Sequence, residues 1–193
     1  MFQVRFHGRG GQGVVTAAEL LASAAFREDR YAQAFPSFGS ERMGAPVMSF
    51  CRIDDKPIRT REPVTEPDAL LIQDPTLLHL AGILDGLRPD GYVLVNSPRG
   101  VEGIGLAEFA AQHRGHLLTV PATNLALESL GRPLPGAPML GGFAALTRAV
   151  GLDALLAAFT ERFNSKVAAG NSAAARAAFD FVSDELKGVT QRA

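Results

Sequence analysis

The chain has 193 residues, 47% of them hydrophobic, and a formal net charge of −1 at pH 7. A chain of this length buries one sizeable core, so we expect a single domain over residues 1–193. The near-neutral charge gives no electrostatic reason to bind nucleic acid or an anionic membrane. The apolar runs are far shorter than the roughly 20 residues that cross a bilayer, and no signal-like segment opens the chain. We therefore expect a cytoplasmic protein without nucleic-acid or membrane partners.

Cysteine usage restricts the redox chemistry that this chain can carry. Cys51 is its single cysteine, so an internal disulfide is excluded. The set of thiolates that usually holds an iron–sulfur cluster is also missing. The alternating neighbours of Cys51 place it in a strand, which predicts a buried structural thiol and not a nucleophile. Any iron–sulfur cluster must therefore belong to another chain.

The amino-terminal segment predicts a strand, a glycine turn and a helix. Apolar residues alternate along 2–6, as in a half-buried strand, and this segment runs directly into the glycine loop, residues 8–13. From 14 to 26 the apolar residues recur at helical spacing, and alanine and leucine dominate. The glycine loop therefore joins a strand to a helix.

A hairpin is expected in the next part of the chain. Residues 31–35 are consistent with a short strand, and residues 47–53 form a longer extended run. Residues 54–56 have the composition of a turn, after which 57–60 is expected to return antiparallel to the extended run.

Strands and helices alternate after the hairpin, and the chain then becomes helical. Apolar strands are expected at 69–73, 92–96 and 117–120, separated by helices at 76–85 and 106–113. Residues 122–193 form a helical carboxyl-terminal part with expected helices at 124–130, 140–150, 152–163 and 173–186.

This alternation decides the fold class. Continuous apolar strands between helices indicate a parallel sheet that is covered on both faces. We predict an α/β, Rossmann-like fold with a mainly parallel sheet, helices on both faces, a β-hairpin insertion and a helical carboxyl-terminal region. A break at 169–171 is expected before the last helix, with Asn171 as the helix cap.

The glycine loop is the first candidate site. Gly8-Arg9-Gly10-Gly11-Gln12-Gly13 fits the pattern G-x-G-x-x-G between a strand and a helix, where free backbone N–H groups favour an anion. The candidate cofactor-binding residues are Arg9, Gly10, Gly11, Gln12 and Gly13. Arg9 suits a phosphate, a carboxylate or a salt bridge to another subunit. A nicotinamide dinucleotide also requires an acidic residue after the second strand, but Glu28 and Asp29 precede that strand.

The connection 34–47 is the second candidate site, and we call it the contact loop. It packs aromatic, charged and turn-forming residues into one segment. The candidates for partner or ligand contact are Phe35, Phe38, Ser40, Glu41 and Arg42. Both phenylalanines are expected either to fold inward or to be buried by a partner, since exposed aromatic side chains mark interaction sites. Glu41 and Arg42 can equally form a solvated surface pair, which contributes little.

The two loops together resemble a known family. The glycine loop followed by Ser37-x-Gly39-x-Glu41-Arg42-x-Gly44-Ala45-Pro46 resembles the gamma subunit of pyruvate:ferredoxin oxidoreductase and of related 2-oxoacid:acceptor oxidoreductases. The resemblance continues through Pro138-Met139-Leu140-Gly141-Gly142-Phe143 and Phe163-x-x-Lys166 to Asn171, so it spans nearly the whole chain.

The resemblance implies a role within a larger enzyme. Members of this family oxidatively decarboxylate a 2-oxo acid to its acyl-coenzyme A with thiamine diphosphate and iron–sulfur clusters, or run the reverse reaction. It implies thiamine-binding alpha and beta subunits and a ferredoxin-like iron–sulfur subunit as partners, which would hold the thiamine diphosphate, magnesium and clusters. This chain would be a non-catalytic subunit, with coenzyme A as a candidate ligand of the glycine loop.

The residues alone keep two alternatives open. The glycine pattern is also compatible with a stand-alone oxidoreductase that binds a nicotinamide dinucleotide, and the absence of an evident base or nucleophile is compatible with a purely structural assembly subunit. No catalytic residue and no metal site is predicted, because the four histidines lack the spacing with cysteines or carboxylates that defines a metal site.

Overall fold

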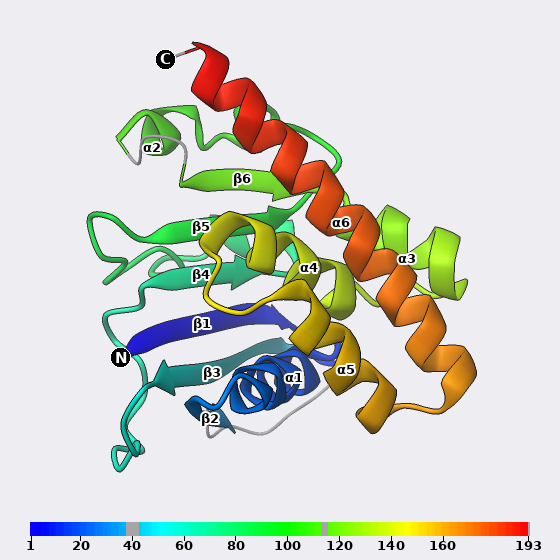
Figure 1. Cartoon of the computed structure of the whole chain (residues 1–193). Helices are drawn as coiled ribbons and strands as arrows, with labels where there is room; N and C mark the ends of the chain where they lie inside the picture. Colours follow the sequence, from blue (N-terminus) through cyan, green and yellow to red (C-terminus); the bar gives the residue numbers. More distant parts are fainter. Residues whose placement is uncertain (38–42, 113–115, 193) are drawn as a thin grey trace.

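A six-stranded mixed sheet forms the centre of the molecule, seen in a computed structural model that describes residues 1–37, 43–112 and 116–192 (Figure 1). The strands are β1 (Phe2–Arg9), β2 (Tyr31–Pro36), β3 (Pro46–Asp54), β4 (Ala69–Ile72), β5 (Tyr92–Asn96) and β6 (Leu117–Val120). Their order across the sheet is β2-β3-β1-β4-β5-β6. β1, β4, β5 and β6 run parallel, and β3 is antiparallel to its neighbours β1 and β2. The predicted α/β class with a mainly parallel sheet is confirmed.

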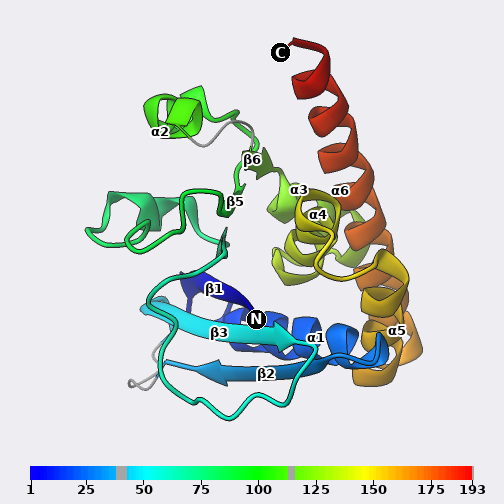
Figure 2. The same ribbon diagram turned by 60° about the vertical axis from the view of Figure 1, so that its left-hand side comes forward.

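One face of the sheet carries most of the helices. The helices are α1 (Val14–Arg27), α2 (Ala107–Gln112), α3 (Ala122–Leu130), α4 (Gly136–Thr147), α5 (Leu152–Arg162) and α6 (Ser165–Arg192). Figures 1 and 2 show α4, α5 and α6 stacked beside this face, where they build the main core together with α1. α4 is buried along almost its whole length because it lies between the sheet and α6.

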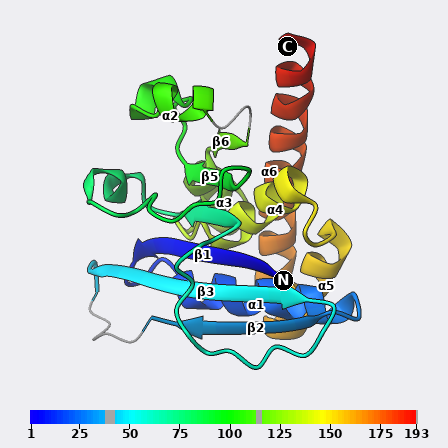
Figure 3. The ribbon, with the colours of Figure 1, turned by 90° about the vertical axis from the view of Figure 1, so that its left-hand side faces the viewer.

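The other face has a thinner and less regular cover. Over β4 and β5 it consists of two short 3-10 helices, η1 (Pro75–His79) and η2 (Glu102–Ile104), the segment 80–91 and α2. Over β3 and β2 the irregular segment that leads to β4 passes across the sheet (Figure 3). Buried arginines hold both irregular segments, since Arg5 donates to the carbonyl oxygens of Ile83 and Asp85 and Arg52 donates to that of Glu62.

The hairpin lies one strand earlier than predicted. β2 pairs with β3, with Phe35 opposite Phe50, and residues 57–60 belong to no strand. Pro57 has no N–H group to give to a ladder, which disfavours a returning strand at that position. The irregular connection between β3 and β4 is instead held by the buried side chain of Val64 and by the hydrogen bond that Arg52 donates to the carbonyl oxygen of Glu62.

Of the predicted helices, 140–150 is shifted toward the amino terminus as α4, and the predictions around 76–85 and 169–171 differ more strongly from the structure. The helix expected at 76–85 is only the short turn η1, because the chain becomes extended at Leu80 and then adopts positive φ at Gly82. The break expected at 169–171 is absent, since α6 runs continuously from Ser165. Asn171 does not cap a helix: its Nδ2 donates to the carbonyl oxygen of Val167 within α6, at 3.0 Å. Gly170 is needed because a Cβ there would lie 2.9 Å from the carbonyl oxygen of Ser129 in α3.

Cys51 is fully buried in β3, as predicted. Burial raises the pKa of its thiol far above the usual range, so it stays protonated. None of the described helices is long and apolar enough to cross a membrane. The described residues also contain no cluster of histidine, cysteine and carboxylate side chains that could hold a metal ion.

Candidate functional site

The strand order places the glycine loop at a topological switch point. From β1 the chain crosses to β2 on one side of the sheet, whereas β4 lies on the other side of β1 and leads to β5 and β6. Ligands of open α/β sheets bind in the crevice beyond the carboxyl ends of the two strands at such a point. The glycine loop begins within the last two residues of β1, Gly8 and Arg9, and continues to α1, and Gln73-Asp74-Pro75-Thr76 follows β4.

The glycine loop ends at an uncapped helix amino terminus. Gly11 (φ 95°) and Gly13 (φ 74°) adopt left-handed conformations that L side chains rarely take. Gly13 is the N-cap of α1, and no described side chain bonds the free amides of the first turn. A hollow of about 300 Å³ opens beside these amides. Its lining residues are Arg9, Gly10, Gly11, Gly13, Val14, Val15, Thr16 and Val47. Such a terminus favours a phosphate or carboxylate.

Arg9 and Gln12 are both held by a carboxylate that the sequence did not point to. Arg9 Nε lies 3.1 Å from Asp74 Oδ2, and Gln12 Nε2 donates to the same oxygen at 2.9 Å. Arg9 also donates to Thr76 Oγ1 at 2.8 Å and to the carbonyl oxygen of Gly44 at 3.0 Å. The positive charge of the loop is therefore neutralised within the chain.

The Asp74 carboxylate stays ionised in this network. Burial acts to raise its pKa, but hydrogen bonds from Thr76 and Gln12 and the charge of Arg9 together lower the pKa below its ordinary value. Asp74 also accepts from the Thr76 amide at 3.0 Å and so caps the turn η1. One side chain thus fixes the start of η1 and the orientation of both polar residues of the loop.

Gln73 lies beneath the glycine loop and is unpartnered. Its side chain is fully buried, and neither Nε2 nor Oε1 has a hydrogen-bond partner among the described residues. A Cβ added at Gly136 would lie 3.9 Å from Gln73 Nε2 and 3.9 Å from the carbonyl oxygen of Gly13. Each buried polar atom left unpaired costs about 1–3 kcal/mol, so this amide calls for a ligand atom or an ordered water.

A second, mainly apolar hollow of about 400 Å³ lies on the other side of the loop. It runs between the start of α1, the end of α3, the start of α4 and the start of α6. Its lining residues are Gln12, Gly13, Thr16, Ala17, Leu20, Leu130, Arg132, Leu134, Gly136, Ala137, Phe163, Val167 and Asn171. Gly13 and Thr16 line both hollows, so the start of α1 separates an amide-rich space from an apolar one.

The contact loop is joined to the glycine loop by backbone hydrogen bonds. Gly10 donates to the carbonyl oxygen of Ala45 at 2.9 Å, and Gly44 donates to that of Gly10 at 3.1 Å. Met43 is 87% exposed, and its methyl group would lie 3.1 Å from a Cβ on Gly11. The two loops therefore form one surface.

Of the predicted contact residues, the structure describes Phe35. It is half-buried on β2, where its ring packs on Phe50 at 5.1 Å between centroids and faces the Arg52 guanidinium at 5.2 Å. This side chain therefore folds onto its own sheet. The other four, Phe38, Ser40, Glu41 and Arg42, lie outside the described residues.

Sequence comparison assigns the chain to a family. Residues 3–181 match the model of the pyruvate ferredoxin/flavodoxin oxidoreductase family. The chain belongs to this family. It is 47% identical over 180 residues to the pyruvate synthase subunit PorC of Methanothermobacter marburgensis, covering 93% of this chain and 97% of that relative. It is 46% identical over 180 residues to the common gamma subunit of the pyruvate/ketoisovalerate oxidoreductases of Thermococcus kodakarensis, covering 93% and 96%.

A solved structure supports the same assignment. The crystal structure of the pyruvate oxidoreductase subunit PORC of Thermotoga maritima matches with a TM-score of 0.78 at 36% identity, covering 93% of this chain and 95% of that one. The family resemblance predicted from the two loops is confirmed.

Sequence analysis missed three residues of the site, which all follow β4 directly. Gln73, Asp74 and Thr76 meet the glycine loop only because β4 lies beside β1. A signal was present in the sequence, since a run of polar and turn-forming residues directly follows the apolar strand 69–72. In a parallel sheet, that position is where ligand-binding residues gather.

Proposed function

We propose that this chain is the non-catalytic gamma subunit of a multisubunit 2-oxoacid:acceptor oxidoreductase and that it positions coenzyme A for the reaction. In this proposal the thiamine-binding alpha and beta subunits and a ferredoxin-like subunit hold the thiamine diphosphate, magnesium and iron–sulfur clusters. The assembled enzyme works in the cytoplasm. Family membership and the names of two relatives, one a subunit PorC and the other a common subunit gamma, support the assembly.

One observation carries the coenzyme A part of the proposal. The uncapped start of α1 lies at the switch point between a hollow rich in backbone amides and an apolar hollow, and the buried, unpartnered amide of Gln73 lies next to Gly136 in the lining of the apolar hollow. Coenzyme A carries phosphate groups and a long uncharged chain with amide groups in one molecule. The amide-rich hollow suits a phosphate, and the apolar hollow suits the chain.

This arrangement would contribute to catalysis through position. Holding the thiol carrier beside a partner's reaction centre converts an encounter into a step within the complex, which lowers the entropic part of the barrier. The surface formed by the glycine and contact loops would then face the thiamine-binding subunits. We propose that Phe38, Ser40, Glu41 and Arg42 make part of that contact.

The test uses Thr16, which lines both hollows and lies in the first turn of α1. A negative charge there stabilises the helix through its dipole but repels an incoming phosphate. We expect Thr16→Glu to raise the KM for coenzyme A of the reconstituted complex by about tenfold or more, through the loss of one phosphate interaction worth about 1.5–3 kcal/mol. Thr16→Gln has nearly the same size without the charge and should change this KM far less.

Three results would contradict the proposal or reorder the alternatives. An unchanged KM for coenzyme A in Thr16→Glu would exclude the start of α1 as a phosphate site. If Arg9→Ala disrupts assembly while that KM is unchanged in the complex that still forms, the purely structural subunit is favoured. Tight binding of NAD or NADP by the isolated chain would favour the stand-alone oxidoreductase, which lacks support because β2 ends at Pro36 and the next residue, Ser37, is not acidic.

A further inference from the structure

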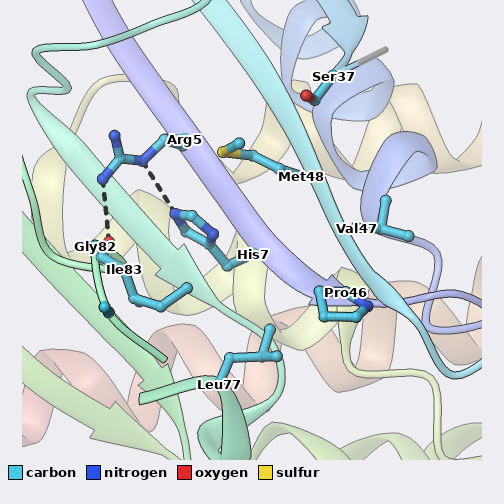
Figure 4. A pocket seen from close by; sticks show the side chains of 10 residues that line it. Arg5, His7, Ser37, Pro46, Val47, Met48, Leu77, Gly82 and Ile83 are labelled. Carbon is cyan, nitrogen blue, oxygen red and sulfur yellow. Dashed lines mark hydrogen bonds between the residues drawn. The ribbon is translucent and has the colours of Figure 1, made fainter. Parts of the chain in front are cut away.

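A separate cavity of about 360 Å³ lies on the face of the sheet opposite α1 (Figure 4). Its floor is the outer face of β1 and β3, and its wall is η1 with the segment that follows. The lining residues are Arg5, His7, Ser37, Pro46, Val47, Met48, Leu77, Ala81, Gly82 and Ile83. Strand alternation places Arg5 and His7 here because Val4 and Phe6 point into the main core.

Arg5 is a buried cation that makes no ion pair with the described residues. Its side chain is only 7% exposed, and it donates to the carbonyl oxygens of Ile83 and Asp85 and to His7 Nε2. All three acceptors are neutral. Burial lowers the pKa of Arg5, and the more distant charge of Asp85 offsets only part of this effect. An unpaired buried charge is expensive, so an anion in the cavity would be strongly favoured.

His7 contributes a second donor. Its Nε2 accepts from Arg5 Nε at 3.0 Å, so the proton of the neutral ring resides on Nδ1. Among the described residues, neither Nδ1 of His7 nor Nη1 of Arg5 has a bonded partner, and neither is sealed from solvent. Ser37 adds a hydroxyl group, and none of the described lining residues carries a carboxylate.

The remaining walls are apolar. Figure 4 shows Arg5 and His7 side by side, with Leu77 and Ile83 on one side and Met48 on the other, whereas the Val47 side chain lies across β3 from Met48. The volume falls within the range of about 300–1,000 Å³ that small-molecule pockets show. A polar end with donors and an apolar wall match a molecule that has one anionic end and a short hydrocarbon body. A doubly charged and fully hydrated anion such as phosphate would leave its oxygens against Leu77 and Ile83.

We propose that this cavity is a binding site for a small aliphatic carboxylate, distinct from the glycine loop. The carboxylate meets Arg5 and His7, and the aliphatic body packs against Leu77, Ile83 and Met48. The donors left free for the carboxylate are Nη1 of Arg5 and Nδ1 of His7, because Nε and Nη2 of Arg5 already donate to His7, Ile83 and Asp85. The phosphate site proposed above lies at the start of α1. Val47 lines the hollow at that site as well as this cavity, but of the two Thr16 lines only that hollow and Met48 only this cavity, so the two sites can be blocked independently.

Met48 allows a test that leaves both donors intact. It lies directly opposite His7 in the register of β1 and β3, which places the two Cβ atoms about 5 Å apart. In Met48→Glu the new carboxylate is tethered within reach of Arg5 and acts as an internal ligand. Met48→Gln has the same shape without the charge and is the matched control.

The probe is 4-methylpentanoate, titrated into the full-length chain while the imidazole signals are followed by NMR and the heat by calorimetry. We expect a saturable shift of the His7 signal, and binding weaker by about tenfold or more for the uncharged 4-methylpentanamide and for inorganic phosphate, because an ionic hydrogen bond contributes about 1.5–3 kcal/mol. Met48→Glu should lose affinity to a similar extent, whereas Met48→Gln should keep it.

Several outcomes would overturn the proposal. A His7 signal that does not respond to the carboxylate excludes the site. Equal binding by Met48→Glu and the unmodified chain places the ligand elsewhere. Equal binding of the amide shows that the charge of Arg5 is not recognised. Thr16→Glu should leave this binding unchanged, so failure here is distinguishable from failure of coenzyme A binding at the glycine loop.

Discussion

Gly141 offers the sharpest test of how the helical layer is built. It lies in α4, where a Cβ would approach the carbonyl oxygen of Ala175 in α6 to 2.0 Å, against an ordinary contact of 3.4–4 Å. The obstacle is backbone, so no rotamer change can relieve it and the two helices must separate by more than an ångström. Overpacking of this kind costs about 3 kcal/mol or more at the upper end of its range, while alanine gains about 1 kcal/mol over glycine in helix propensity.

Gly141→Ala should therefore destabilise the chain by about 2 kcal/mol or more, which lowers Tm by about 4–8 °C for a chain of this size. The matched control is Gly188→Ala in α6, where nothing lies within 4 Å of the added Cβ. That change should raise stability by up to about 1 kcal/mol through propensity alone. Urea and thermal unfolding followed by circular dichroism measure both variants. Equal stability of the two would show that α4 and α6 do not pack as closely as this structure has them.

Two further predictions concern titrating groups. Burial, with the charge of Arg5, holds the pKa of His7 at about 4, against 6.5 for the free side chain. The free energy of unfolding should therefore fall by up to about 3 kcal/mol as pH drops from 6.5 to 4. In His7→Gln, urea unfolding should show a weaker dependence of stability on pH over this range. The depressed pKa of Asp74 stabilises the fold above the unfolded value of about 3.9 and is lost as pH falls through the folded pKa. Asp74→Asn should cost about 1–2 kcal/mol at pH 7, since the pair with Arg9 is partly exposed. The difference in stability between the two proteins should shrink only as pH falls below the unfolded pKa of about 3.9.

The sequence predicted most elements because their signals are local. Alternation along 2–6 and helical spacing over 14–26 depend on near neighbours in the chain, and both elements are present as β1 and α1. The predictions that failed concern features set by contacts between residues far apart in the sequence. Gly170 resembles a helix breaker, yet it is a point of close approach to α3, which no local pattern reveals. The pairing of β2 with β3 also depends on contacts that the turn at 54–56 does not encode.

In the candidate site too, the part with a local sequence signal was predicted and the part formed by distant residues was not. The glycine loop was recognisable because its spacing between a strand and a helix has a direct physical meaning. Its partners Asp74 and Gln73 are more than sixty positions away and become neighbours through strand order alone. The Arg5 cavity was not predicted, since it requires a charged strand residue to be covered by an irregular segment.

The internal pairing of Arg9 bears on how the glycine loop would select a ligand. Arg9 is the single charged residue of the loop, and Asp74 already neutralises it. An incoming phosphate then meets mainly backbone amides, whose attraction is weaker than that of a free cation. Inorganic phosphate alone should bind poorly under these conditions. A ligand whose phosphate is joined to a body that fills the apolar hollow gains the remaining free energy from burial. Selectivity for coenzyme A over abundant small phosphates would thus come from the Asp74 carboxylate, because it neutralises the guanidinium of Arg9.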